Sequence, residues 1–187
     1  MMAAMDTKSL LTLVAVTGLL SAPAHAEIEN IAQHCDQKLC LSWWPKLPPL
    51  KGWHQDRPSS LRNSINALAP DGRTFANAEA VIYARAIYKP RVPDVRSLDQ
   101  LIENDKRDFL ASNPNISIKA ANALVTGDGQ SLRSFNFIPG GTGNWERVSF
   151  GEEGKFYLIF TLSSRSERSY KDAMNAYETL IATYREK

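Results

Sequence analysis

The sequence contains few of the residues from which catalytic and metal-binding sites are commonly built. Its 187 residues include 3 histidines and 2 cysteines, and it lacks the Gly-x-Ser-x-Gly motif that presents a serine nucleophile in many hydrolases. The sequence also lacks a large excess of charge of either sign. Its 22 Lys and Arg nearly balance its 20 Asp and Glu, which leaves a formal net charge of +2 at pH 7. Such a weak, interspersed positive balance does not favour a nucleic-acid or membrane partner.

Long hydrophobic runs are absent except near the N-terminus. Lys8 precedes an apolar run from Leu10 to Leu20, and Ala24-His25-Ala26 follows as a small-residue cleavage site, which is the layout of a secretory signal peptide. The run is too short to cross a bilayer comfortably, so no transmembrane segment is expected in the mature chain. We therefore predict a signal peptide over residues 1–26, a mature chain that starts near Glu27, and a periplasmic or secreted protein of one domain.

The two cysteines, Cys35 and Cys40, lie close together in the mature chain. In an exported protein such a pair is most simply a disulfide. A loop this small should stabilise the fold by only about 2 kcal/mol, so we expect a local staple. It lies in an N-terminal arm, residues 27–49, that is rich in tryptophan and proline.

Trp43 and Trp44 stand in this arm, just before three closely spaced prolines. Proline spacing of this kind favours an extended segment that runs along the surface. Two adjacent tryptophans that face water would lower solubility, so we expect Trp43, Trp44 and Leu47 to be pressed into the body of the domain. The alternative is an exposed aromatic patch that meets a partner.

The main domain, residues 50–187, carries a series of strand patterns. Strands are predicted at Ser60–Leu68, Ala80–Tyr88, Ile116–Val125, Leu132–Ile138, Trp145–Phe150 and Lys155–Leu162. The first alternates weakly and is expected at an edge of the sheet. The last has apolar or semi-polar residues on both faces, which is typical of a central strand covered from both sides.

Two helices accompany these strands. The first begins with Ser97, which has a glutamine three residues later as in a capping box, and ends at Asn113-Pro114. The second carries an apolar stripe from Tyr170 to Tyr184. Ser169, with an aspartate three residues on, and Ser166 are alternative N-caps for it. Hairpins broken by two helices predict an α+β fold, with a single antiparallel sheet and two main helices packed on it.

This arrangement resembles the Mog1/PsbP-like group, which includes the PsbP-type extrinsic proteins of photosystem II and several bacterial families of unknown function. The resemblance covers roughly Leu50 to Lys187. It rests on Gly52-Trp53, the Ala80–Tyr88 strand, the middle helix, and the ending Lys155–Leu162 followed by Tyr170–Tyr184. It implies a sandwich of helices on a sheet and a non-enzymatic binder, adaptor or assembly factor. The arm before Leu50 is not part of the pattern.

Two groups of residues are weighed as ligand sites. His34, Cys35, Cys40 and His54 could supply nitrogen and sulfur ligands, but the spacing is not that of usual zinc sites and an oxidising compartment favours the disulfide. The backbone N–H groups of Gly140–Gly143 could form an anion-binding nest, yet this stretch leads into a strand, as a mobile hairpin connection does. We predict neither a metal ion nor a cofactor.

Binding is the remaining class of function, and aromatic and arginine side chains dominate interface energetics. The candidate contact residues are Trp43, Trp44, Trp145, Arg165 and Arg168. We therefore expect an exported, non-catalytic binding or accessory protein that acts on another protein or component of the cell envelope. One alternative is an inhibitor or immunity protein that plugs the cleft of an exported toxin or hydrolase. Another is an enzyme with a deep pocket of perturbed titratable groups around His54.

Overall fold

The computed structural model describes residues 28–35 and 38–185. The predicted signal peptide, residues 1–26, and the side chain of Cys35 lie outside the described part. The elements are β1 (Ile28–Cys35), β2 (Lys38–Pro45), β3 (Trp53–Gln55), α1 (Arg57–Asn63), β4 (Asn66–Pro70), β5 (Ala80–Tyr88), a 3-10 turn (Lys89–Arg91), α2 (Leu98–Ser112), β6 (Ser117–Val125), β7 (Ser131–Ile138), β8 (Trp145–Glu153), β9 (Phe156–Ser164) and α3 (Glu167–Thr183). No helix in the described residues combines the length and the apolar character needed to cross a membrane.

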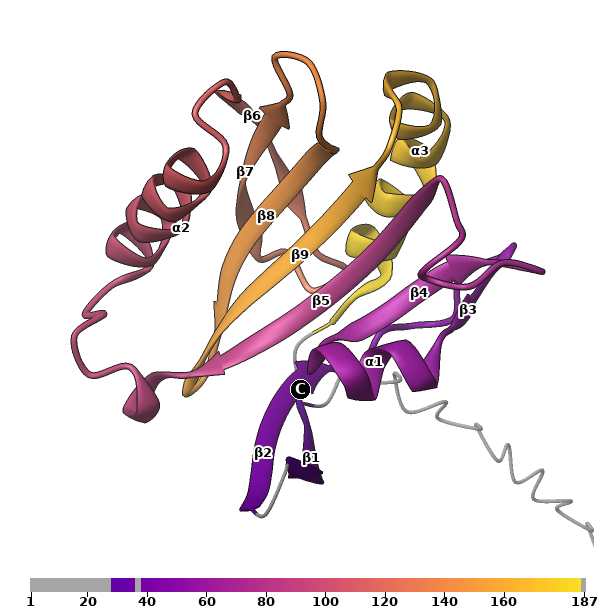
Figure 1. The fold of residues 1–187 in the computed structure, drawn as a ribbon. Coiled ribbons are helices and arrows are strands. Elements are labelled where there is room, and N and C mark those ends of the chain that lie inside the picture. The colour runs from indigo at the N-terminus through magenta and orange to yellow at the C-terminus, as the bar shows by residue number, and fades with distance from the viewer. Residues whose placement is uncertain (1–27, 36–37, 186–187) are drawn as a thin grey trace, which may run out of the picture.

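The strands form one antiparallel sheet (Figure 1). Its order is β1-β2-β5-β9-β8-β7-β6, and β4 pairs with β5 while β3 pairs with β4. Strand β9 lies between β5 and β8, and its side chains enter the hydrophobic cores on both faces of the sheet. The prediction of a central strand covered from both sides is therefore confirmed, and so is the α+β class with an antiparallel sheet.

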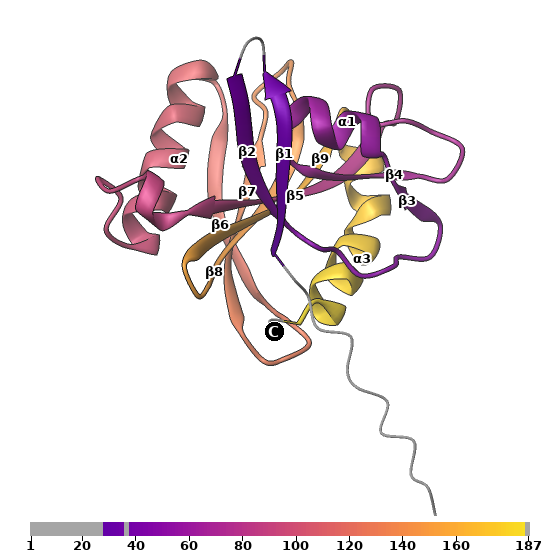
Figure 2. The ribbon, with the colours of Figure 1, turned by 90° about the horizontal axis from the view of Figure 1, so that it is seen from below.

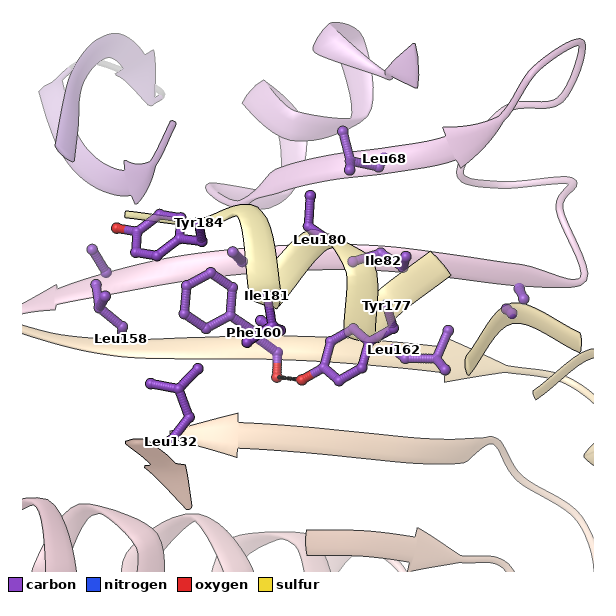
Figure 3. Close-up of a cluster of buried hydrophobic side chains, with 14 residues drawn as sticks. Leu68, Ile82, Leu132, Leu158, Phe160, Leu162, Tyr177, Leu180, Ile181 and Tyr184 are labelled. Atoms are coloured by element: carbon purple, nitrogen blue, oxygen red, sulfur yellow. Dashed lines mark hydrogen bonds between the residues drawn. The ribbon is translucent and has the colours of Figure 1, made fainter. Parts of the chain in front are cut away.

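Helix α3 covers one face of the sheet (Figure 2). Its stripe places Ala173, Tyr177, Leu180 and Ile181 in the core against β5 and β9. Figure 3 shows the Tyr177 ring beside β9, where its hydroxyl donates to the carbonyl oxygen of Phe160 at 3.0 Å. The predicted apolar stripe is confirmed, because a helix with one apolar face lies flat on a sheet that buries this face.

Helices α1 and α2 lie on the opposite face (Figures 1 and 2). Helix α2 packs Leu101 and Ile102 against Phe137 of β7 and Phe150 of β8. Helix α1 lies beside β4 instead. Tyr157 and Ile159 of β9 belong to the same core as α2. Further along the sheet, Ser163 and Ser164 of β9 and Val81 and Tyr83 of β5 line a pocket instead.

The prediction that Ser60–Leu68 is one strand is wrong at its start, because Ser60 lies within α1. Asp56 is the N-cap of this helix, and its Oδ1 accepts a hydrogen bond from the Ser59 N–H at 3.0 Å. A proline in the first turn suits a helix start, and Ser64 ends the helix in the left-handed conformation, with a φ of 55°. Strand β4 begins only at Asn66.

The helix starts test the predicted caps. Ser97 is the N-cap of α2, as predicted, and its side chain accepts from the N–H of Gln100. Helix α3 begins one turn earlier than the Ser169 alternative requires, because Ser166 is its N-cap and accepts from the Ser169 N–H at 3.2 Å. Glu167 in the first turn adds a favourable interaction with the helix dipole.

The N-terminal arm extends the sheet. Strands β1 and β2 form a hairpin, and Trp43 of β2 pairs with Ala86 of β5. Strand β4 pairs with the same edge of β5 between Ile82 and Ala84, so two strands share this edge. The buried side chain of Asn66 connects them, because its Nδ2 donates to the carbonyl oxygen of Pro45 at 2.9 Å. The expectation of a merely extended segment is corrected by this pairing.

Strand β6 is an outer strand of the sheet, and it contains a bulge. Its register with β7 shifts between Ala121 and Leu124. Arg147 of β8, which is only 8 % exposed, donates through Nη2 to the carbonyl oxygen of Asn122 at 2.7 Å. The guanidinium thus satisfies a backbone acceptor within the irregular stretch of β6.

Candidate functional site

A trough lies on the helix-free part of the sheet face that carries α1 and α2. It consists of two pockets that share Asn144 and Glu146 in their lining. The first, the α2-side pocket, has a volume of about 440 Å³ and lies between the end of α2, the start of β6 and the 139–144 loop. The second, the α1-side pocket, has a volume of about 360 Å³ and lies between the α1–β4 junction and the ends of β5 and β9. Volumes of this size are typical of small-ligand sites.

Glu146 lies where the two pockets meet. It belongs to β8, opposite Ser163 of β9, and it is only 6 % exposed. The Ser163 Oγ donates to Glu146 Oε1 at 2.7 Å, and the Asn144 side-chain amide donates to the same Ser163 Oγ at 3.1 Å. Asn144, Ser163 and Glu146 therefore form a short hydrogen-bonded chain along the floor of the trough.

Tyr83 of β5 continues this floor, and an ion pair between β5 and α2 lies beside it. Tyr83 of β5 is half-buried in the α1-side pocket, and its ring packs edge-on against Phe75, with 5.9 Å between centroids. Arg85, two residues further along the same face, donates from Nη2 to Asp105 Oδ1 of α2 at 3.1 Å. This ion pair bridges from α2 to β5.

Burial shifts the titration of the carboxyl groups here. Burial raises the pKa of Glu146 above its usual value, the hydrogen bond from Ser163 opposes the shift, and the negative charge of Asp105 adds to it. Burial likewise raises the pKa of Asp105, against the lowering effect of Arg85. For Tyr83, burial and then the charge of Glu146 raise the phenol pKa. The trough therefore holds ionisable groups whose charged forms are incompletely solvated.

Replacing Glu146 by glutamine is expected to raise stability in a pH-dependent way. Below the ordinary glutamate value of 4.5 the carboxyl is protonated whether the chain is folded or not. As the pH rises above this value the unfolded chain releases the proton first, so Glu146 destabilises the fold increasingly until its raised folded pKa is passed. Thermal unfolding at about pH 4 and about pH 8 should show Glu146→Gln gaining on the wild type only at the higher pH. A gain of equal size at both values would contradict this account.

The glycine-containing loop between β7 and β8 shapes the α2-side pocket. A Cβ on Gly140 would lie 2.3 Å from the carbonyl oxygen of Asn115, so only glycine permits this close approach to the start of β6. Gly140 and Gly143, predicted to be part of a hairpin connection or an anion nest, both line this pocket.

The predicted contact residues fall in different places. Arg165 lines the α1-side pocket, and its Nη2 donates to the carbonyl oxygen of Ala76 at 2.5 Å. Trp145 lies half-buried on the opposite face, where its ring is 6.1 Å from that of Tyr170. Arg168 lies on α3, and its side chain is 92 % exposed, with a weak i,i+4 pairing to Asp172.

The two tryptophans of the arm also lie outside the trough. Trp44 is fully buried, so the expected burial is confirmed for this residue and the exposed-patch alternative is wrong for it. Trp43 is half-buried, with its ring 5.3 Å from Tyr88 and 6.2 Å from Phe156, and the Arg91 guanidinium lies 4.4 Å from its ring centroid. Trp44 cannot contact a partner while the protein is folded.

The cysteines and histidines of the described residues lie on three strands of the N-terminal part of the sheet, β1, β2 and β3. Cys35 ends β1 and Cys40 lies on β2, and the hairpin register places Cys40 two residues beyond the residue opposite Cys35. The disulfide between them stays a prediction. His54 is exposed on β3, with Nδ1 3.5 Å from Asp71 Oδ1. Among the described residues no group of three or more His, Cys, Asp or Glu side chains could hold a metal ion.

Sequence reasoning missed Glu146, Tyr83 and Asp105. A usable signal existed for Glu146, because a charged residue in a strand next to the centre of a sheet needs a partner. Its partner Ser163 is 17 residues away, and only the pairing of β8 with β9 brings them together.

The comparisons with known proteins add no family assignment. The chain matches no protein-family model and no curated protein sequence.

Proposed function

We propose that the protein is an exported, non-catalytic binding or accessory protein, and that another protein of the cell envelope engages it through the trough. The signal-peptide pattern of residues 1–26 supports export. The sheet lies between two layers of helices, with α1 and α2 on one face and α3 on the other. This layering is compatible with a Mog1/PsbP-like sandwich. That resemblance supports an adaptor or assembly role, although a fold alone does not establish function.

The open sheet face carries this proposal. One face is filled by α3 and its core, whereas the face that carries α1 and α2 contains the two adjoining pockets of the trough. The strip offers hydrogen-bonding groups from several elements, among them Asn144, Ser163 and Tyr83. A concave, polar surface on a rigid sheet suits an inserted segment of a partner better than a flat contact.

The shape of the trough favours an accessory protein over an inhibitor. An inhibitor that plugs the cleft of a hydrolase needs a protruding element, whereas the trough receives one. The enzyme alternative places perturbed titratable groups around His54, and Asp56 nearby has a pKa lowered chiefly by the hydrogen bond from the Phe75 N–H. The carboxyl groups whose pKa burial raises are instead Glu146 in the trough and Asp105 beside it. The trough is therefore the better place to search for either a partner or a substrate.

Photo-crosslinking from the rim of the trough should capture one dominant partner in intact envelopes. Thr142 and Ser112 are exposed and line the α2-side pocket, so a photoreactive side chain at either position would lie within reach of an inserted segment. We expect the same adduct from both positions, identified by mass spectrometry.

Thr179 provides the matched control position, because it is exposed on α3, on the opposite face of the sheet. A photoreactive group at position 179 should give no such adduct. Equal labelling from position 179 would contradict the proposal. So would the absence of an adduct from both rim positions in envelopes of the native source, which contain the partner.

A further inference from the structure

The α2-side pocket has an unbalanced charge. Its lining residues are Phe109, Ser112, Asn113, Pro114, Asn115, Ile116, Pro139, Gly140, Thr142, Gly143, Asn144 and Glu146. Glu146 is the single ionisable side chain among them, and the others are amides, hydroxyls, prolines, glycines and apolar groups. A ligand in this pocket therefore meets one carboxyl group and no cation.

No described residue neutralises Glu146. The ion pairs among the described residues do not include it, and the nearby Arg85 is engaged by Asp105. Its Oε1 accepts from the Ser163 Oγ, whereas no described residue donates to Oε2. A carboxyl group that is 6 % exposed, in contact with a cavity, therefore keeps free acceptor capacity.

We propose that the α2-side pocket binds a protonated amine or a guanidinium group, with Glu146 as its counter-ion. The inference rests on the proposed binding function, because an arginine or lysine side chain of the partner is one source of this group. A small free amine is the other. A charge-assisted hydrogen bond to Oε2 would add a second partner to the Ser163 hydroxyl, which donates to Oε1.

The rest of the lining fits a cation better than an anion. Phe109 provides an aromatic wall, against which a cation is favourable. Amide and hydroxyl oxygens of Asn113, Asn115 and Thr142 can accept the remaining N–H groups. An anion would be repelled by the Glu146 carboxylate, and the lining offers no cation to offset this repulsion. The volume of about 440 Å³ accommodates a whole arginine or lysine side chain.

Binding should strengthen as the pH rises. Burial raises the pKa of Glu146, the hydrogen bond from Ser163 of β9 lowers it, and the negative charge of Asp105 of α2 raises it further. Glu79 and Arg165 are the other charged residues that line the α1-side pocket with Glu146. Arg85 of β5 faces Asp105, and Tyr83 of the same strand stays neutral because burial raises its pKa. A bound cation favours the ionised carboxylate, so binding releases a proton in the range where free Glu146 is still protonated.

The test is an amide NMR titration of the mature protein with three capped tripeptides, Gly-Arg-Gly, Gly-Lys-Gly and Gly-citrulline-Gly. Citrulline keeps the shape of arginine without its charge. The two cationic peptides should shift the amides of Asn113, Asn115, Ile116 and residues 140–144 saturably, with a Kd in the millimolar range. The citrulline peptide should bind at least about tenfold more weakly. Glu146→Gln should bind the cationic peptides more weakly by the same factor and without the pH dependence. Thermal unfolding of this variant is the check that it folds.

Two results would overturn the inference: equal binding of the citrulline peptide, or unchanged binding by Glu146→Gln. An absence of shifts at these amides with every cationic probe, agmatine included, would overturn it as well. The proposed function is decided separately, because photo-crosslinking from position 142 does not depend on charge. A rim adduct without cation binding would support the partner proposed under the function and overturn the proposal of a cation site. Saturable binding of agmatine without an adduct would make a small amine the ligand.

Discussion

Trp44→Ala should lower the free energy of unfolding by about 3–5 kcal/mol, the range for removing a large buried aromatic side chain. Trp44 is 0 % exposed, and its Nε1 donates to Glu29 Oε2 at 2.9 Å. The Arg57 guanidinium, at the start of α1, lies 5.3 Å from its ring centroid. The side chain thus joins β1, β2 and α1, and its loss leaves a cavity at this junction. Urea unfolding followed by circular dichroism measures the change.

Trp43→Ala is the matched control at the neighbouring position. Trp43 is half-buried on the other face of the sheet, so its replacement should cost about 1–2 kcal/mol. Equal losses for both variants would contradict the argument that the full burial of Trp44 gives it the larger effect. A binding defect of Trp44→Ala alone would report unfolding, because this side chain is not on the surface.

Tyr177→Ala should have a similarly large effect, about 3–5 kcal/mol. The ring is fully buried at the centre of the α3 core (Figure 3). Its hydroxyl lies 2.8 Å from Ser149 Oγ, which in turn is 2.7 Å from Ser134 Oγ. Chemical unfolding of the variant should therefore show loss of both packing and a buried hydrogen-bond network.

Tyr177→Phe separates these two contributions. It keeps the ring but leaves the carbonyl oxygen of Phe160 and the Ser149 hydroxyl without this partner, at a cost of about 1–3 kcal/mol. Tyr170→Phe, which removes a hydroxyl from a half-buried ring of the same helix, should cost less. If Tyr177→Phe is as stable as the wild type, the buried network does not stabilise the fold.

The sequence predicted the elements whose patterns are long and regular. The stripe of α3 and the two-faced strand β9 each repeat one periodicity over eight or more residues. A capping motif marks the start of α2. Helix α1 was missed because its seven residues are too few for a periodic signal, and its start depends on the Asp56 cap. The β1–β2 hairpin was missed because prolines dominate the end of the arm, while the strands themselves precede them.

The candidate site was less predictable. Arg165 and the Gly140–Gly143 loop were singled out, and both line the trough. The raised pKa of Glu146 results from its burial, and its hydrogen bond comes from Ser163 on the next strand. The local sequence indicates neither this environment nor the availability of Oε2 as an acceptor. Sites built from the face of a sheet depend on strand order, which local patterns do not specify.

The bulge in β6 bears on how copies of this chain behave when they are concentrated. An outer strand with regularly spaced unpaired backbone groups can pair with a strand of another chain. Aggregates of β-sheet proteins often form in this way. Here Arg147 holds the Asn122 carbonyl from inside, and the break in register limits the regular stretch to Ser117–Ala121, which carries the charge of Lys119. The buried Arg147 guanidinium thus favours solubility, because it holds the bulge that makes β6 a poor partner for a strand of another molecule.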